Sequence, residues 1–238
     1  MSTNRRRVRT GARLFALFAL TAAAALSLPA SPLLAAPAES VSQEKLMAPA
    51  ATPLSTHALG NPDAPVTIVE YASLTCSHCA DFHNEIFPKL KAKYIDTGKV
   101  YFIFREMPFD PVATAGFMLA RCMPEDKYFP TVGALFETQR SWAFGNDPAA
   151  GLRTVAKQAG MSDAAFEKCL TDNELAAKVQ ASSSYASKEL EVRGTPTFFV
   201  NGKRVNGAIG MEAWDKELEP LLAAAGKTDT PAEKTKTE

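Results

Sequence analysis

The 238-residue chain carries 26 Lys and Arg residues against 26 Asp and Glu residues, and 46% of its residues are hydrophobic. A chain of this length suits one domain, or one domain with an insertion, and can build an ample hydrophobic core. The balanced charge excludes a strongly basic surface of the kind that nucleic acids bind, so we expect no nucleic-acid partner.

The first 38 residues have the composition of an export signal. Five arginines lie in the basic N-terminal stretch, and no acidic residue precedes Glu39. The apolar run 14–28 follows, and it is shorter than the roughly 20 residues that a membrane-spanning helix needs. Ala36-Pro37-Ala38 is one cleavage site, with cleavage after Ala30 or Ala36 as alternatives. Residues 1–38 are therefore predicted to be a signal peptide, although an uncleaved membrane anchor is the alternative.

Export would change both the charge and the redox environment of the chain. Removing residues 1–38 removes five arginines and no acid, which leaves 21 basic against 26 acidic residues and a net charge of −5. The periplasm is an oxidising compartment in which disulfides persist. Composition alone predicts a linker at 39–56 and a disordered polar tail at 226–238.

Two apolar runs predict neighbouring strands of a parallel sheet. Val66–Tyr71 and Val100–Phe104 are both near-continuously apolar, as strands buried on both faces are. A helix is expected between them, from about Cys76 to Ile95, with a kink at Pro88. Strand, helix and strand in this spacing form a βαβ unit.

The following stretch, 111–190, changes to a helical apolar period. Helices are expected at 113–122, 129–139, 151–158, 163–170 and 174–190. Thr171 and Glu174 fit a capping box at the start of the last of these helices. Asn201-Gly202 predicts a hairpin turn. One face of a final helix carries Trp214, Leu218, Leu221 and Leu222.

Cys76-Ser77-His78-Cys79 directly follows the first predicted strand, at the start of the predicted helix. Two thiols at this spacing can close a small reversible disulfide, and the helix dipole stabilises a thiolate at the helix N-terminus. Half of a zinc site is the alternative, but zinc needs two more ligands. His83 could supply one, whereas Cys122 and Cys169 are distant in sequence. We therefore expect redox chemistry, with no metal and no cofactor.

The segment Ala64–Cys79, taken with Gly194-Thr195-Pro196-Thr197-Phe198, resembles the DsbA family of periplasmic thiol–disulfide oxidoreductases. The likeness extends from residue 57 to about residue 225. It implies an α/β architecture, a thioredoxin fold with an inserted α-helical domain. The implied parts are the first part of the fold at 57–110, the helical insert at 111–190 and the second part of the fold at 191–225.

The resemblance also implies roles for the motif residues. Cys76 would form the mixed disulfide with a client protein, and Cys79 would be the resolving cysteine. His78 would donate hydrogen bonds or positive charge toward the Cys76 thiolate, unless it is only a solvated turn histidine. Thr195-Pro196 would be a cis-proline turn whose backbone pairs with an extended client peptide, with a purely structural turn as the alternative.

Glu70 is an acid within an otherwise apolar strand, where a carboxylate is costly unless it is paired or functional. It matches the buried acid that the family places beneath the active-site helix, where it could move a proton to or from Cys79. Arg105 is a possible partner, and an exposed strand edge is the alternative position for Glu70. His57 and His83 have no recognisable partner and are predicted to lie on the surface.

Cys122 and Cys169 each lie near the end of a predicted helix of the insert. Because the chain is predicted to be exported, a structural disulfide between them is favoured over two free buried cysteines. Closing a loop of about 48 residues would stabilise the fold by about 4 kcal/mol. Some DsbA-like proteins carry such a second bridge.

The leading functional interpretation is a monomeric dithiol oxidase that introduces disulfides into reduced exported proteins. In the family, a quinone-linked membrane partner reoxidises such an enzyme. A disulfide isomerase or reductase is the closest alternative, although only about 20 linker residues precede the fold, too few for a separate dimerisation domain. A non-catalytic peptide-binding chaperone is the other alternative. The chain departs from the family at two positions. Ser77 replaces a frequent proline, which leaves the oxidising strength open, and Thr195 replaces the valine of the best-known members.

Overall fold

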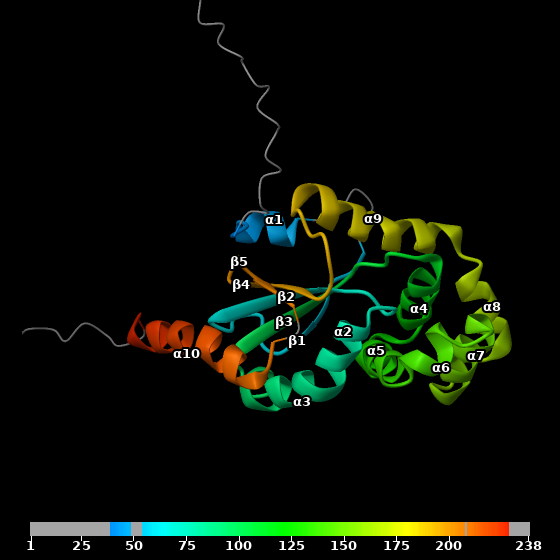
Figure 1. Cartoon of the computed structure of the whole chain (residues 1–238), viewed down its shortest axis with the longest axis horizontal. Coiled ribbons are helices and arrows are strands. Elements are labelled where there is room, and N and C mark those ends of the chain that lie inside the picture. The colour runs from blue at the N-terminus through cyan, green and yellow to red at the C-terminus, as the bar shows by residue number, and fades with distance from the viewer. Residues whose placement is uncertain (1–38, 49–53, 208, 229–238) are drawn as a thin grey trace, which may run out of the picture. The chain divides into compact units, whose positions relative to one another are not determined.

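Figure 1 shows a computed structural model of the chain, which describes residues 39–48, 54–207 and 209–228. The predicted signal peptide and residues 229–238 of the predicted tail lie outside these ranges. None of the helices in the described ranges combines the length and hydropathy needed to cross a bilayer.

A five-stranded mixed sheet forms the centre of the fold, in the order β1-β3-β2-β4-β5. Its strands are β1 (His57–Leu59), β2 (Val66–Ala72), β3 (Val100–Glu106), β4 (Thr197–Val200) and β5 (Lys203–Asn206). The predicted parallel pair is confirmed, because β2 and β3 run parallel with Glu70 opposite Phe104. All other pairs are antiparallel. The two apolar runs thus occupy the buried central strands.

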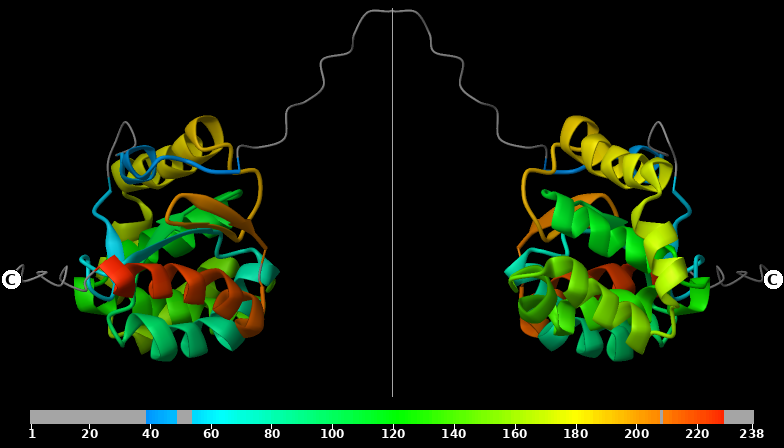
Figure 2. Two further views of the ribbon diagram at one scale, coloured as in Figure 1. Left: turned by 90° about the vertical axis from the view of Figure 1, so that its left-hand side faces the viewer. Right: turned by 90° about the vertical axis from the view of Figure 1, so that its right-hand side faces the viewer.

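One unbroken helical run covers one face of the sheet together with α10 (Met211–Thr228) (Figure 2). It consists of α2 (Ser77–Asp81), η1 (Phe82–Ile86), α3 (Phe87–Leu90) and η2 (Lys91–Ile95). Both η segments are π-helical turns, and Pro88 is the second residue of α3, two residues after the first π turn ends. Proline has no N–H and its ring clashes with the preceding turn of an α-helix. The wider π turn therefore stands where the sequence predicts a kink.

The insert follows β3 and lies beside the sheet (Figure 1). Its helices are α4 (Pro111–Arg121), η3 (Glu125–Lys127), α5 (Tyr128–Glu137), α6 (Gln139–Ala143), α7 (Pro148–Gln158) and α8 (Asp163–Leu170). The chain returns through α9 (Asn173–Glu189), whose Ala186 packs against Val69 and Ile103 on the second face of the sheet. This end of α9 therefore belongs to the sheet layer, although the sequence places it in the insert.

The predicted linker is wrong for residues 40–47. Ser40 bridges to Lys203 at the β5 edge, and α1 (Gln43–Met47) packs the fully buried Leu46 onto the second face of the sheet. The Val41 N–H donates to the Gly202 carbonyl at 2.8 Å. A Cβ on Gly202, whose φ is +90°, would lie 2.4 Å from the Val41 carbonyl oxygen, so glycine in the hairpin turn permits this close pairing.

Two boundary predictions also need correction. The capping box at Thr171 and Glu174 is wrong, because Asp172 caps α9 by accepting from the Leu175 N–H at 2.9 Å. The Thr171 hydroxyl instead donates to the Glu167 carbonyl in the last turn of α8. The helix α10 extends to Thr228, so the predicted tail starts too early by three residues.

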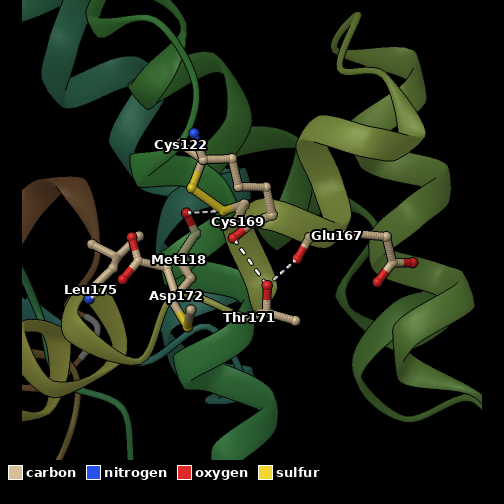
Figure 3. The surroundings of a disulfide bond; sticks show 8 residues. Met118, Cys122, Glu167, Cys169, Thr171, Asp172 and Leu175 are labelled. Atoms are coloured by element: carbon tan, nitrogen blue, oxygen red, sulfur yellow. Dashed lines mark hydrogen bonds between the residues drawn. A yellow bond between two sulfur atoms is a disulfide. The ribbon is translucent and has the colours of Figure 1, made fainter.

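The predicted bridge between Cys122 and Cys169 is confirmed, with a Cα–Cα separation of 6.0 Å. Cys122 ends α4, and Cys169 lies in the last turn of α8 (Figure 3). The Cys169 sulfur also lies 3.1 Å from the Met118 carbonyl oxygen, one turn before the end of α4. The bridge thus joins the first and last helices of the insert.

Candidate active site

The cysteine pair lies where β2 ends and the helical run begins. Cys76 is the N-cap residue and is half-buried, whereas Cys79 is buried one turn further along. Both cysteines are free. The loop before the helix is held by Gln139 of α6, whose side-chain amide donates to the Leu74 carbonyl at 2.8 Å and to the Cys76 carbonyl at 2.9 Å. The insert therefore anchors the active-site loop, a role that nothing in the sequence around Gln139 indicates.

The proline turn lies directly against this pair. The Thr195-Pro196 peptide bond is cis, as the resemblance implies. The Thr195 carbonyl oxygen lies 3.2 Å from the Cys76 sulfur, across 119 residues of sequence. A pocket of about 330 Å³ opens beside the turn, lined in part by Arg193 and Arg204. The two motifs that carry the family resemblance thus form one site.

The environment of Cys76 favours its thiolate. A hydrogen bond from the Cys79 thiol is the largest effect that lowers the pKa of Cys76 to about 5, and burial opposes it. The Thr195 hydroxyl and the backbone amides of Cys79 and His78 add further hydrogen bonds that lower the same pKa. Donors that converge on a sulfur at a helix N-terminus stabilise its negative charge.

The environment of Cys79 has the opposite effect. Burial raises the pKa of the Cys79 thiol well above its usual range, and the negative charges of Cys76 and Glu70 raise it further. At neutral pH the reduced pair therefore consists of a half-buried thiolate and a buried thiol. This asymmetry separates an attacking cysteine from a resolving cysteine.

The His78 side chain points into solvent. Its ring is 77% exposed, and its Nδ1 atom lies 3.9 Å from the Asp81 carboxylate. The hydrogen bond that His78 contributes to the Cys76 sulfur comes from its backbone amide. The geometry thus favours the solvated turn histidine over direct donation from the ring.

Glu70 is fully buried, and its partner is His83 rather than Arg105. The His83 Nε2 atom lies 3.1 Å and 2.9 Å from the two carboxylate oxygens. The predictions of a surface His83 and of an Arg105 partner are wrong, because the Arg105 guanidinium donates to the Thr56 hydroxyl. A usable signal was present in the sequence: His83 comes four residues after Cys79, which places both on one helix face.

His57 is also not a surface residue. Its ring stacks on Tyr128 with ring centroids 3.5 Å apart. Burial is the largest cause that lowers the pKa of His57 to about 4, and the Arg121 charge acts in the same direction. The Tyr128 hydroxyl donates to Glu106, which is ion-paired with Arg121. This cluster ties β1 to the insert and shares no residue with the cysteine site.

Within residues 39–48, 54–207 and 209–228, no cluster of three or more His, Cys, Asp and Glu side chains could hold a metal ion. A larger pocket of about 1070 Å³ lies beside β1 and is lined by His57, Phe87, Tyr101 and Phe129 among others. It includes neither cysteine of the pair and no residue of the proline turn.

The pH dependence of Cys76 reactivity should report this geometry. We expect the rate of Cys76 alkylation by iodoacetamide to rise with pH through a midpoint near 5, the pKa of Cys76. Thr195→Val removes one hydroxyl donor to the thiolate and should raise that midpoint by about one unit. Thr197→Val is the matched control, because the Thr197 hydroxyl donates to the Gly194 carbonyl instead. Equal midpoints in native protein and Thr195→Val would contradict the assignment.

Comparisons with known proteins agree with this geometry. The thioredoxin family matches residues 52–220. A Rickettsia bellii protein named "Putative protein-disulfide oxidoreductase" is 35% identical over 145 residues, covering 60% of this chain and 56% of that protein. This chain thus spans little more than half the length of that relative. "Disulfide bond formation protein D" of Bacillus subtilis is 31% identical over 175 residues, covering 69% of this chain and 76% of that protein.

A solved structure aligns over nearly its whole length. The crystal structure of α-DsbA1 from Wolbachia pipientis is 33% identical in sequence, with a TM-score of 0.69. The match covers 75% of this chain and 96% of that structure. The paired thiols, the cis-proline turn and the inserted helices all lie within a fold shared with these proteins. The chain therefore belongs to the DsbA family of thioredoxin-fold thiol–disulfide oxidoreductases.

Proposed function

We propose that this protein is a dithiol oxidase that introduces disulfides into exported proteins through the Cys76–Cys79 pair. The observation that carries the proposal is the opposite tuning of the two thiols beside the cis-proline turn. A binding-only chaperone would need neither thiol, so the tuned pair disfavours that alternative. The cycle needs no metal and no cofactor.

The proposed cycle begins with the oxidised enzyme. A client thiolate attacks the Cys76 sulfur, a client–Cys76 disulfide forms, and the Cys76–Cys79 bond breaks. The Cys79 sulfur leaves with the bonding electrons and takes up a proton, for which Glu70 is the proposed donor. A second client thiolate then attacks the client sulfur of the mixed disulfide, and Cys76 leaves as a thiolate. The client has lost two electrons and the enzyme has gained them.

The low pKa of Cys76 supports the oxidase direction. Its value of about 5 lies below the ordinary 9.0, so the reduced folded protein gains stability as pH rises from about 5 to about 9. The oxidised protein has no such group and gains nothing in this window. Below pH 5 the thiol is protonated in both the folded and unfolded chains, and the advantage is lost. Near neutral pH the reduced form is therefore favoured, which makes the disulfide an oxidant.

Client recognition is proposed to use the backbone at Thr195-Pro196, which would pair with an extended peptide. His78 lies on the exposed side of the pair, where its ring is free to meet a client. We further propose that the protein acts in the periplasm as a monomer. A quinone-linked membrane partner would reoxidise it.

The reduction potential tests the direction of transfer. Equilibration with glutathione over a range of redox ratios should give a potential nearer to about −120 mV than to about −270 mV. A value near the lower figure would favour a thioredoxin-like reductant. A reduced, unfolded substrate with several cysteines provides the second measurement. An oxidase should form disulfides in it stoichiometrically, whereas an isomerase should rearrange scrambled disulfides instead.

A further inference from the structure

Glu70 and His83 form a buried hydrogen-bonded pair that the exchange cycle above uses only in part. Their side chains are 0% and 4% exposed. The imidazole Nε2 lies within hydrogen-bond distance of both carboxylate oxygens, at 3.1 Å and 2.9 Å. Glu70 comes from the central strand β2 and His83 from the π turn η1, so the pair joins the sheet to the active-site helix.

The rings packed around His83 are apolar and cannot titrate. Phe87, Phe104 and Phe136 pack around the His83 ring with centroid separations of 4.9, 5.6 and 4.3 Å. These rings come from α3, β3 and α5. On the β4 side, Phe198 lies opposite Glu70 in the sheet. None of these four rings brings a charge to the pair.

Two other sets of ionisable groups face this side of the sheet. One is Cys79, one helical turn before His83, whose thiol is influenced by the Glu70 charge. The other is Glu106 with its partners Arg121 and Tyr128. The Phe104 ring contacts both the His83 ring and the Tyr128 ring, so it lies between the two sets. Cys79 is therefore the group with which the pair can exchange a proton.

A carboxylate alone in such surroundings would take up a proton, because burial disfavours its charged form. A carboxylic acid that already holds a proton cannot accept another. An imidazolium at hydrogen-bond distance reverses this preference, because it stabilises the carboxylate directly. A donor at the His83 position would thus stabilise the carboxylate form of Glu70, the form that can act as a base.

We propose that His83 is a positioning residue that keeps Glu70 ionised, so that Glu70 can take the proton from Cys79 when Cys79 resolves a mixed disulfide at Cys76. The inference rests on the proposed function and adds a residue to it. In this step the Cys79 proton moves to a Glu70 oxygen, and a Cys79–Cys76 bond forms. The bond from Cys76 to the bound thiol breaks, and that thiol leaves with the electron pair. The reverse step returns the proton from Glu70 to Cys79.

Single-turnover oxidation by glutathione disulfide separates the two chemical steps. The Cys76 thiolate first attacks glutathione disulfide and releases one glutathione, and Cys79 then displaces the second. His83→Phe keeps an aromatic ring between its neighbours and removes both nitrogens, while His83→Gln keeps a donor and removes the charge. In both variants we expect release of the second glutathione at pH 7 to slow by about tenfold. The native rate of this step should return when the pH is raised by about one unit.

Two further variants complete a double-mutant cycle. Glu70→Gln removes the proton acceptor and should slow the same step at least as much. Because His83 acts through Glu70, the double variant Glu70→Gln/His83→Gln should be no slower than Glu70→Gln alone. The first step and the pH midpoint of Cys76 alkylation serve as internal controls, and the His83 variants should leave both unchanged.

The outcomes separate a failure of the role proposed for His83 from a failure of the proposed function. If native protein forms no Cys76–Cys79 disulfide with glutathione disulfide, the proposed function itself fails. If native protein completes both steps but either His83 variant keeps the native rate and pH profile, only the role of His83 is overturned. A slowing that is equal in both steps and independent of pH would reduce His83 to a packing residue and would likewise overturn the inference.

Discussion

Replacing Cys79 by alanine is expected to abolish dithiol oxidation and to leave Cys76 held in mixed disulfides with client proteins that already contain a disulfide. The Cys76 thiolate attacks the client disulfide, one client sulfur leaves as a thiolate, and the other client sulfur stays bonded to Cys76. Cys79 is buried one turn after Cys76, so it is the thiol placed to displace a bound client from inside the enzyme. Without it, release depends on a second thiol of the client or on a thiol from solution. We expect no dithiol oxidation that a standard assay can detect. Disulfide-linked adducts should be visible on non-reducing gels.

The same substitution should also alter Cys76. The largest effect lowering the Cys76 pKa is the hydrogen bond from the Cys79 thiol. Cys79→Ala removes that donor and should raise the pKa of Cys76 by about one to two units. Cys79→Ser is the matched variant, because its hydroxyl keeps a donor but cannot form a disulfide. Adducts should therefore form at pH 6 faster with Cys79→Ser than with Cys79→Ala.

The experiment has a clear negative control. Cys76→Ala retains Cys79 but removes the half-buried sulfur beside the proline turn, so it should form no adducts. Adducts in that variant, or turnover by Cys79→Ser, would contradict the assignment of attacking and resolving roles. Both outcomes are read by the same gels and by mass spectrometry of the adducts.

Local sequence patterns predicted much of the scaffold. The near-continuous apolar runs that became β2 and β3 have no competing interpretation as amphipathic helices. The helix expected at 163–170 matches α8 at both ends, because Ser162 supplies an N-cap and accepts from the Ala165 N–H. The cysteine spacing is likewise a local pattern, so these features depend on neighbours in sequence. The cis-proline turn at Thr195-Pro196 is instead implied by the resemblance to the DsbA family.

The features that could not be predicted from the sequence depend on packing between segments that are distant along the chain. The pairing of Glu70 with His83 follows from the sheet position of β2 and the rotation of a helix that contains π turns, and the four-residue spacing of Cys79 and His83 indicates only that these two share a helix face. A regular helical wheel describes such a helix poorly beyond its first turn. Leu46 is buried only because α1 folds back onto the sheet, and a five-residue helix has too few positions to show a period. His57 is covered because Tyr128 comes from the insert.

Among single covalent changes, opening the Cys122–Cys169 disulfide should cause the largest loss in the free energy of unfolding. It closes a loop with a sequence separation of 47 residues. Chain entropy then predicts a stabilisation of about 4 kcal/mol, because the bridge restricts the unfolded chain. The native packing of α4 against α8 holds the two sulfurs together, so little is lost in the folded state.

Substitution would mix this effect with a packing defect, since Cys169 is buried in the core and contacts Met118. A cleaner measurement uses Cys76→Ala/Cys79→Ala, which keeps only the bridge. Urea unfolding of this variant with and without reductant compares the same side chains with the bridge closed and open. Reduction should lower the free energy of unfolding by up to about 4 kcal/mol. It should also increase the m-value, because the unfolded chain exposes more surface once the loop is opened. A loss below about 1 kcal/mol with an unchanged m-value would mean that residual structure or the helix packing, rather than the bridge, holds the two ends of the insert together.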